Sequence, residues 1–189
     1  MRRIAIFASG TGTNAENIIK HFFYSDRVIV AAVFCNNAKA GVVDRARQYG
    51  IPAVVFNRED LYDTNRILRN LREFEIDFIA LAGFMWLLPD YLVKEYSNQI
   101  INIHPALLPK YGGKGMYGEK VHQAVIENKE KESGITIHYV NESYDQGEII
   151  YQHKCEVAPD ETPESLAEKV HQLEYEHYPQ VIEEILAGI

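Results

Sequence analysis

A hydrogen-bond donor and a group that can exchange protons stand two residues apart in the stretch "NIHP", at Asn102 and His104. Residues i and i+2 of a strand point to the same face, so the amide and the imidazole would be neighbours where Pro105 ends the strand. An amide donates hydrogen bonds to an oxygen that gains negative charge, and an imidazole gives or takes a proton near neutral pH. The same pattern also fits the polar face of an exposed strand, with His104 hydrogen-bonded to a loop.

A carboxylate that could complete such a site occurs later, at Asp145, in the segment "NESYDQG" between two apolar runs. An aspartate in a turn most often serves the local chemistry of the turn. If the fold brings Asp145 beside His104, the carboxylate would orient the imidazole and act as its partner in proton transfer. Sequence spacing leaves both interpretations open.

A glycine turn near the start of the chain, "SGTGTN", lies between an apolar run and a helical pattern. Thr13 and Glu16 have the spacing of a capping box, and the free N–H groups of a helix start attract anions. Alanine at position 15 and the absence of an acid after the second strand argue against a dinucleotide site, and no Gly-Lys-Ser/Thr follows. The turn is therefore either a single-phosphate site at Gly12, Thr13 and Asn14 or a plain strand-to-helix connection.

The elements that must position these groups alternate between short apolar runs and helical patterns. Apolar residues recur at helical spacing along residues 15–22 and again along residues 61–71. This alternation favours a mostly parallel sheet with helices on both faces. The expected strands are residues 3–8, 28–36, 53–56, 78–84 and 100–104.

The pattern changes near residue 134, where two strand-like runs, 134–140 and 148–157, flank the segment that contains Asp145. They predict an antiparallel C-terminal strand pair and hence a mixed sheet. A last helix is expected to begin with Thr162 as N-cap, and Pro179 would kink or divide it. Because no linker or repeat interrupts the chain, we expect residues 1–189 to form a single α/β domain with a Rossmann-like sheet.

Composition narrows the range of functions. The net charge of −8 argues against a broad nucleic-acid surface. The longest uncharged apolar run, 78–88, is too short to cross a bilayer, and the N-terminal apolar core is too short for a signal peptide. Cys35 and Cys155 are expected as reduced thiols, and the histidines lack metal-ligand spacing. We expect a cytoplasmic monomer or homodimer with small-molecule partners, without nucleic acid, membrane or metal.

Four stretches, "GTGTN", "LAGFMWLLP", "NIHPALLPKYGGKG" and "SYDQGEII", resemble in order the motifs of the glycinamide ribonucleotide formyltransferase family. The resemblance extends over about residues 2–185. It implies direct transfer of a formyl group from 10-formyltetrahydrofolate, the cosubstrate, to the amine of glycinamide ribonucleotide, through a tetrahedral intermediate, in de novo purine (IMP) biosynthesis. Related formyltransferases carry extra domains, so the length of this chain leads us to expect the purine acceptor.

The resemblance also implies a role for individual residues. Asn102, His104 and Asp145 would be the catalytic residues. Trp86 stands where an arginine is common in the family. The implied binding residues are Gly12, Thr13, Asn14, His171 and Glu174 for the acceptor, and Arg58, Met85, Trp86, Leu87, Leu88, Asn141, Glu142, Ser143 and Tyr144 for the folate.

The expected mechanism uses Asn102 and a protonated His104 to stabilise negative charge on the formyl oxygen, while Asp145 favours the imidazolium and helps to pass a proton to the folate nitrogen. No covalent enzyme intermediate is needed. Two alternatives stay open: a formyltransferase that acts on an amino sugar nucleotide, and a non-catalytic nucleotide-binding module.

Two further histidines lie near these motifs. His138, in the strand before Asp145, either lines the pocket or is an ordinary hydrogen-bonded strand histidine. His122 follows the glycine-rich stretch after His104, and we expect it on a helix surface rather than in catalysis.

Overall fold

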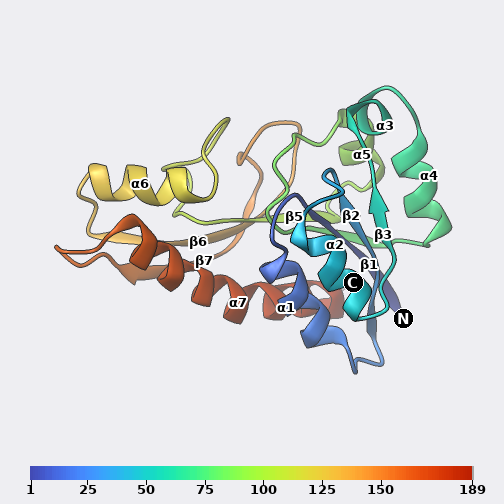
Figure 1. Ribbon diagram of the computed structural model, residues 1–189, viewed down its shortest axis with the longest axis horizontal. Coiled ribbons are helices and arrows are strands. Elements are labelled where there is room, and N and C mark those ends of the chain that lie inside the picture. The colour runs from blue at the N-terminus through green and yellow to red at the C-terminus, as the bar shows by residue number, and fades with distance from the viewer. Residues whose placement is uncertain (189) are drawn as a thin grey trace.

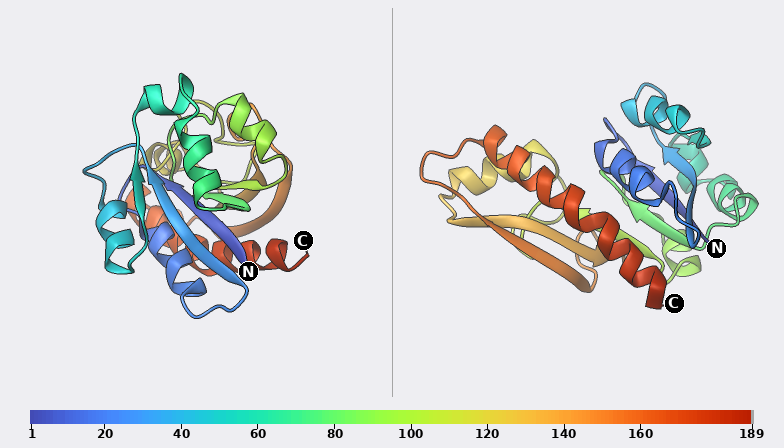
Figure 2. Two further views of the ribbon diagram at one scale, coloured as in Figure 1. Left: turned by 90° about the vertical axis from the view of Figure 1, so that its right-hand side faces the viewer. Right: turned by 90° about the horizontal axis from the view of Figure 1, so that it is seen from below.

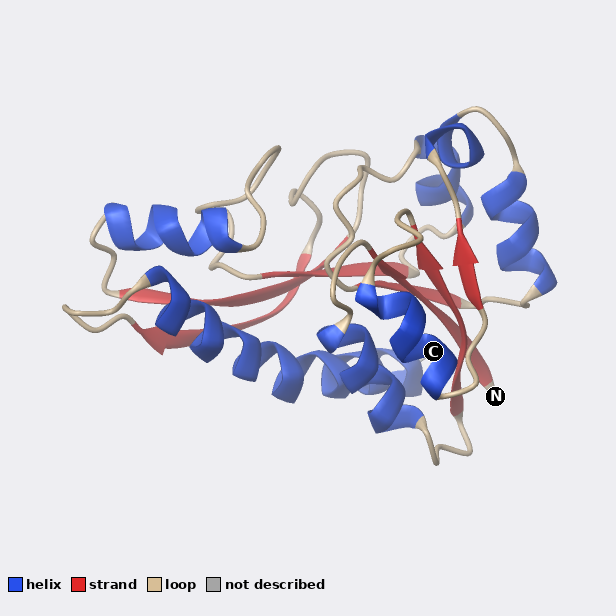
Figure 3. Cartoon of the chain, viewed as in Figure 1, coloured by secondary structure: helices blue, strands red, loops and turns tan. Residues whose placement is uncertain are grey.

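A single twisted sheet of seven strands, in the order β3-β2-β1-β4-β5-β6-β7, forms the centre of the computed structural model (Figure 1 and Figure 3). The structure describes residues 1–188. Each expected strand is present, and the differences are confined to the strand ends. The strands are β1 (Arg2–Ala8), β2 (Val28–Cys35), β3 (Ala53–Val55), β4 (Phe78–Leu81), β5 (Ile100–His104), β6 (Glu132–Tyr139) and β7 (Ile149–Glu156).

The first five strands are parallel, and the last two extend the sheet in antiparallel fashion. The predicted mixed α/β sheet is therefore confirmed. The strand order reverses direction at β1 and β4, which lie side by side although β2 and β3 come between them in the chain. At such a reversal the connections after the two strands diverge and leave a crevice beyond their carboxyl ends, where ligands of α/β proteins bind.

Helices cover both faces of the sheet (Figure 2). One face packs against α1, α2 and α7, and the opposite face packs against α3, α4 and α5. The helix α6 lies against α7 beside the antiparallel part of the sheet (Figure 1). The helices are α1 (Thr13–Phe22), α2 (Gly41–Gln48), α3 (Arg58–Tyr62), α4 (Arg66–Glu73), α5 (Asp90–Glu95), α6 (Glu119–Glu127) and α7 (Pro163–Gly188).

The start of α1 differs from the predicted capping box. Gly12 is the N-cap, in the left-handed conformation with φ 80°, and no side chain caps the helix. Glu16 turns away from the helix start, because its carboxylate pairs with Arg45 and with Lys20 and accepts a hydrogen bond from Tyr49. The expected box at Thr13 and Glu16 is therefore wrong, and the first N–H groups of α1 are left without a side-chain partner.

The helical pattern at residues 61–71 forms two short helices, α3 and α4, instead of one. Asn57 and Asp60 form a capping box that starts α3, with side-chain to backbone distances of 2.9 and 3.0 Å. The segment between the two helices contains Asp63, Thr64 and Asn65, which favour helix ends and turns over helix interiors. Leu61, Ile67 and Leu71 still bury their side chains in the same cluster.

The last helix, α7, runs without interruption from Pro163 to Gly188, with Pro179 inside it. The predicted N-cap is confirmed, since the Thr162 hydroxyl accepts a hydrogen bond from the N–H of Ser165 at 3.2 Å. Tyr178 on this helix is fully buried, and its hydroxyl donates toward the carbonyls of Leu81 in β4 and Ile101 in β5, at 2.9 and 3.3 Å. The helix is thereby fixed to the two central strands.

No helix within residues 1–188 is both long enough and apolar enough to cross a membrane.

Candidate active site

Asn102, His104 and Asp145 meet at the carboxyl end of β5. Asp145 Oδ2 lies 3.6 Å from Nδ1 of His104, and Asp145 Oδ1 lies 3.5 Å from Nδ2 of Asn102. The carboxylate comes from the loop between β6 and β7, and the N–H of Gly113 donates to its Oδ2 at 2.9 Å. A strand end and two loops that are far apart in the sequence thus place an amide, an imidazole and a carboxylate around one point.

His138 belongs to the same cluster, as a buried and hydrogen-bonded strand histidine that also faces Asn102 and Asp145. It lies directly opposite Asn102 in the antiparallel pairing of β5 and β6. Its Nε2 lies 3.2 Å from Nδ2 of Asn102 and 3.6 Å from Oδ1 of Asp145. We call Asn102, His104, His138 and Asp145 the polar rim.

Backbone carbonyls determine which ring nitrogen of each histidine carries a proton. His104 Nε2 lies 2.7 Å from the carbonyl oxygen of Tyr111, and His138 Nδ1 lies 2.8 Å from that of Tyr139. A carbonyl only accepts, so these nitrogens donate and the other ring nitrogen of each neutral imidazole is free to accept. The free nitrogen of His104 is Nδ1, which faces Asp145. The free nitrogen of His138 is Nε2, which accepts from the amide of Asn102.

Burial sets the charge state of the polar rim. The His104 residue is only 3% exposed, and burial lowers its pKa below the ordinary value even though the Asp145 carboxylate raises it. Burial also raises the pKa of Asp145, but His138, the charge of His104 and the N–H of Gly113 outweigh it and lower the pKa overall. At neutral pH the lowered pKa leaves His104 a neutral imidazole beside the Asp145 carboxylate when no substrate is bound. The expected protonated His104 belongs to the step in which the formyl oxygen gains charge, and it stays a prediction.

The glycine turn lies at the carboxyl end of β1, on the same side of the sheet as the polar rim. Asn14 Nδ2 donates to Oε2 of Glu174 at 2.8 Å, across 160 positions of sequence. Glu174 is 5% exposed, and burial raises its pKa to about 7, against the hydrogen bond from Asn14 that lowers it. The structure thus brings together three predicted acceptor residues, Gly12, Asn14 and Glu174, and Thr13 adjoins them as the first residue of α1.

His171 lies apart from that contact. It occupies the exposed side of α7, where its ring stacks near Tyr175 with centroids 6.2 Å apart. Its other neighbour is His122 at 6.4 Å. His122 is 1% exposed, so the expected surface position is wrong: the α6 face that carries it packs against α7. Both His122 ring nitrogens are buried without a hydrogen-bond partner in the described structure.

Trp86, one of the predicted folate residues after β4, lies next to Tyr62 of α3. We call these two rings the aromatic platform. The guanidinium of Arg58 lies over the Trp86 ring at 4.6 Å and over the Tyr62 ring at 5.9 Å. The Tyr62 hydroxyl donates to the carbonyl of Leu87 at 2.8 Å. The planes of the Tyr62 and Trp86 rings are tilted by 32° with centroids 6.4 Å apart, and the cation of Arg58 lies over both.

Met85 and Leu88, the first and last of the predicted folate residues after β4, differ in exposure. Met85 is 47% exposed, and its N–H donates to the hydroxyl of Ser9 at 3.0 Å. Leu88 is 2% exposed and packs in the core with α5. The Met85 side chain is thus accessible to a ligand, whereas the Leu88 side chain anchors the segment in the hydrophobic core.

The loop between β6 and β7 carries the remaining predicted folate residues. Asn141 Oδ1 accepts a hydrogen bond from the N–H of Ser143 at 3.0 Å, a local turn contact, and Glu142 is exposed. Burial raises the pKa of Tyr62, Arg58 lowers it, and Tyr144 raises it to a smaller extent. The end of the loop carries Asp145 into the polar rim.

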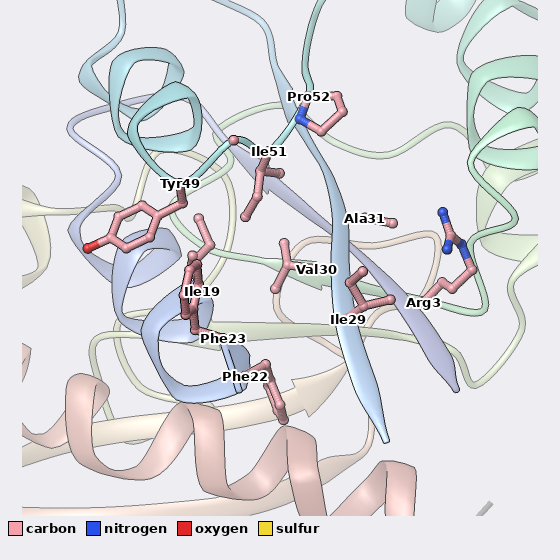
Figure 4. A pocket seen from close by; sticks show the side chains of 11 residues that line it. Arg3, Ile19, Phe22, Phe23, Ile29, Val30, Ala31, Tyr49, Ile51 and Pro52 are labelled. Carbon is pink, nitrogen blue, oxygen red and sulfur yellow. The ribbon is translucent and has the colours of Figure 1, made fainter. Parts of the chain in front are cut away.

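A second concave region lies at the amino ends of the strands (Figure 4). This cavity of about 280 Å³ lies between the ends of α1 and α2 and the start of β2. Apolar side chains dominate its wall, and Arg3 and Tyr49 are its only charged or hydroxyl-bearing side chains. We call it the apolar hollow; it is lined by Arg3, Ile19, Phe22, Phe23, Ile29, Val30, Ala31, Tyr49, Gly50, Ile51 and Pro52.

Two parts of the site could not be found from residue types alone. The carbonyl of Tyr111 and the N–H of Gly113 act through the backbone, which leaves no side-chain signal. His138 could be singled out from its place in the strand before Asp145, but its position opposite Asn102 follows only from the register of β5 and β6. Across residues 1–188, no group of three or more His, Cys, Asp or Glu side chains has the arrangement of a metal site.

Known proteins match this chain along almost its whole length. The Formyl transferase family matches residues 2–182. The chain is 40% identical to the chloroplastic phosphoribosylglycinamide formyltransferase of Arabidopsis thaliana over 96% of its own length and 64% of the plant protein. It is 37% identical to the phosphoribosylglycinamide formyltransferase of Bacillus subtilis, over 98% of this chain and 95% of the relative. The chain thus spans less than two thirds of the plant relative.

Solved structures give the same result. The crystal structure of glycinamide ribonucleotide transformylase 1 from Geobacillus kaustophilus matches 98% of this chain and 99% of that chain, with a TM-score of 0.89 and 38% identity. The crystal structure of the phosphoribosylglycinamide formyltransferase from Anaplasma phagocytophilum matches 99% of this chain and 88% of that chain, with a TM-score of 0.89 and 36% identity. From the extent of these matches, the chain belongs to the formyl transferase family.

Proposed function

We propose that the chain transfers the formyl group of 10-formyltetrahydrofolate to the amine of glycinamide ribonucleotide, in de novo purine biosynthesis. The observation that carries the proposal is the convergence of Asn102, His104 and Asp145 at the carboxyl end of β5. The names of the relatives above support the choice of acceptor. The proposal keeps the expected cytoplasmic location and the expected assembly as a monomer or a homodimer.

The proposed proton path begins at the free ring nitrogen of His104. When the acceptor amine attacks the formyl carbon it loses a proton, and Nδ1 of His104 is unprotonated at neutral pH and faces Asp145 at 3.6 Å. The carboxylate stabilises the imidazolium that results. The same proton then passes to the folate nitrogen that leaves, which returns His104 to its neutral state. No covalent bond to the protein forms at any point.

The amide of Asn102 would stabilise the negative charge that grows on the formyl oxygen. Its Nδ2 already has two acceptors, Nε2 of His138 at 3.2 Å and Oδ1 of Asp145 at 3.5 Å. The longer contact is weak, so that N–H can turn to the substrate oxygen at little cost. The contact to His138 keeps the donor end of the amide, rather than its oxygen, directed at the substrate. A donor held in this way contributes about 3–4 kcal/mol to the transition state.

The glycine turn would bind the phosphate of the acceptor. The first N–H groups of α1 have no side-chain cap, and Gly12 is held in the left-handed conformation. Such groups at a helix start attract an anion. The contact between Asn14 and Glu174 places a buried carboxyl next to the turn, where it would accept from the ribose hydroxyls.

The folate would lie between the aromatic platform and the loop that carries Asp145. A folate has a fused ring system and an acidic tail, and the platform has an aromatic surface with the cation of Arg58 beside it. Met85 and Trp86 would contact the ring or the tail, and the segment Asn141 to Tyr144 would close over the other side. This placement brings the formyl group to the polar rim.

An absorbance assay of 10-formyltetrahydrofolate deformylation tests the proposal directly. We expect turnover with glycinamide ribonucleotide and none without it. Turnover without an acceptor would indicate a hydrolase, and turnover only with an amino sugar nucleotide would indicate the sugar formyltransferase. Binding of glycinamide ribonucleotide without turnover in any of these mixtures, by a folded protein, would leave the non-catalytic module.

A further inference from the structure

The glycine turn is enclosed from behind by α2, a helix to which neither the sequence motifs nor the proposed reaction gives a role. The two helices α1 and α2 pack together next to the end of β1 (Figure 1). A Cβ atom at Gly12 would lie 2.5 Å from Cβ of Val42, and one at Gly41 would lie 3.0 Å from the carbonyl oxygen of Thr11. The first turn of α2 therefore fits closely against the outside of the glycine turn.

The carbonyls of residues 10–12 in the glycine turn each accept a hydrogen bond. The N–H of Val42 donates to the carbonyl of Gly10 at 3.2 Å, and the N–H of Glu16 donates to that of Gly12 at 2.8 Å. The carbonyl of Thr11 accepts instead from a side chain, Nε of Arg45, at 2.9 Å. Arg45 is thus the one cation that fixes the turn through a side-chain bond among the contacts described for residues 10–12.

Arg45 also compensates a charge that would oppose anion binding. Glu16 lies in the first turn of α1, its side chain is 15% exposed, and Nη1 of Arg45 donates to its carboxylate. Lys20 pairs with the same carboxylate at 2.8 Å, and the hydroxyl of Tyr49 donates to it at 3.1 Å. A carboxylate so close to a helix start would repel a phosphate unless a cation were held against it.

We propose that Arg45 is a positioning residue for the phosphate of the acceptor: by joining the Thr11 carbonyl to the Glu16 carboxylate, it keeps the N–H groups of the glycine turn available to the anion. This inference rests on the proposed function. The planar guanidinium donates from Nε and Nη1 in one fixed geometry, which a lysine ammonium cannot reproduce. Arg45 acts through the turn and need not touch the substrate.

The test measures equilibrium binding of two ligands that differ by one group, glycinamide ribonucleotide and glycinamide riboside, by isothermal titration calorimetry. In Arg45→Met we expect the Kd of the ribonucleotide to rise about tenfold or more, as for the loss of a hydrogen bond to a charged group, and the Kd of the riboside to stay within about twofold. Saturated turnover should stay within about twofold, because the polar rim is unchanged. A general loss of folding would instead affect both ligands equally.

Arg47→Met is the matched control on the same helix. Arg47 pairs only with Asp44 at 2.8 Å, and both side chains are 74% exposed, so neither Kd should change. Arg45→Lys keeps the charge and should stay severalfold weaker than the wild type for the ribonucleotide. Full recovery with lysine, or equal losses for both ligands in Arg45→Met, would overturn the inference.

Gly41→Ala provides a second variant if Arg45→Met does not fold. The added Cβ presses on the Thr11 carbonyl without removing a charge, so it should weaken the ribonucleotide more than the riboside. No change for either ligand would contradict the inference. If the wild type binds no glycinamide ribonucleotide, the proposed function fails; if the wild type binds it and these variants bind it equally well, the inference alone fails.

Discussion

The two ends of the parallel strands differ in chemistry. At the carboxyl end the polar rim buries an amide, two imidazoles and a carboxylate within hydrogen-bonding distance of one another. At the amino end the apolar hollow is lined mostly by aliphatic and aromatic side chains (Figure 4). Buried polar groups cost free energy unless they are paired, whereas buried apolar groups stabilise the fold. Under the proposed function, activity would depend on the carboxyl end of the sheet, while the apolar hollow at the amino end contributes to stability, so substitutions at the two ends should have different effects.

The largest effect is expected at the polar rim. His104→Ala should lower turnover by about 10²–10⁴-fold, because it removes the proposed base. The thermal midpoint should fall, because the ring is 3% exposed and its contacts with the Tyr111 carbonyl and with Asp145 are lost, but the protein should stay folded at the assay temperature. Steady-state kinetics with a parallel melting curve checks both. His21→Ala, which removes a histidine paired with Glu183 on the surface, should leave turnover unchanged; near-normal turnover in His104→Ala would refute the assignment.

The converse effect is expected at the apolar hollow. Phe22→Ala should lower the free energy of unfolding by about 3–5 kcal/mol, because the ring is 3% exposed and leaves a cavity. The folded fraction should keep its normal turnover. Urea denaturation measures the free energy of unfolding, and steady-state kinetics measures turnover. The adjacent Phe23 is 51% exposed, so Phe23→Ala should cost much less. Equal losses in both variants would contradict the comparison.

The buried carboxyl of Glu174, next to the glycine turn, predicts a stability that falls with rising pH. Burial raises the pKa of Glu174 to about 7 from an ordinary value of 4.5. Between pH 4.5 and pH 7 the carboxyl is therefore protonated in the folded state and ionised in the unfolded state. The penalty for charging Glu174 is therefore absent below pH 4.5 and complete above pH 7. Glu174→Gln should raise the free energy of unfolding at pH 8 by up to about 3 kcal/mol and change it little at pH 4.5. An equal shift at both pH values would rule out this origin.

A smaller effect of opposite sign is expected for His122. Burial lowers its pKa to about 4 from 6.5, assisted by His171 and His104, so the unfolded state binds a proton between these values that the folded state refuses. Stability is therefore complete above pH 6.5 and is lost as the pH falls toward 4. His122→Leu should stabilise the protein by about 1–2 kcal/mol at pH 5 relative to its effect at pH 7. Urea curves at the two pH values test this, and an unchanged pH dependence would contradict it.

The strands could be predicted from sequence because each is a short apolar run that ends in polar or turn residues. The bounds of β5, Ile100–His104, agree with the expectation, since Pro105 ends the strand. The run after β4 was expected to continue to residue 84, but β4 ends at Leu81. The two apolar residues that follow Gly83, Phe84 and Met85, belong instead to the connection that leads to the aromatic platform. Hydrophobicity alone does not distinguish a strand from such a connection.

The start of α1 could not be predicted locally. Thr13 and Glu16 have the right spacing for a capping box, but Glu16 has stronger partners in Arg45 and Tyr49, which lie about thirty positions away. Charge-assisted contacts at long range outweigh a local cap. The split between α3 and α4, in contrast, was visible in the sequence as Asp63-Thr64-Asn65, three residues that favour helix ends.

The candidate site was predictable in its residue types and only partly in its geometry. Asn102 and His104 stand two positions apart in a strand and so point to the same face, and a proline ends the strand directly after them. These two features were enough to propose a site at the strand end. The approach of Asp145 and His138 depends on the register between β5 and β6, which follows from three-dimensional pairing. The orientation of each ring depends on the backbone carbonyls of Tyr111 and Tyr139, which have no signature in residue type.

The strand order leaves two open edges, β3 and β7, and each has a different protection against aggregation. An unpaired edge exposes N–H and C=O groups that can add a strand from another chain. β3 has three residues, too few to hold a foreign strand. β7 has eight, but it carries Lys154 and Glu156, and Lys154 is held by Glu132 at 3.1 Å. The charged side chains of β7 and the short length of β3 would thus hinder a strand of another molecule from pairing with either edge.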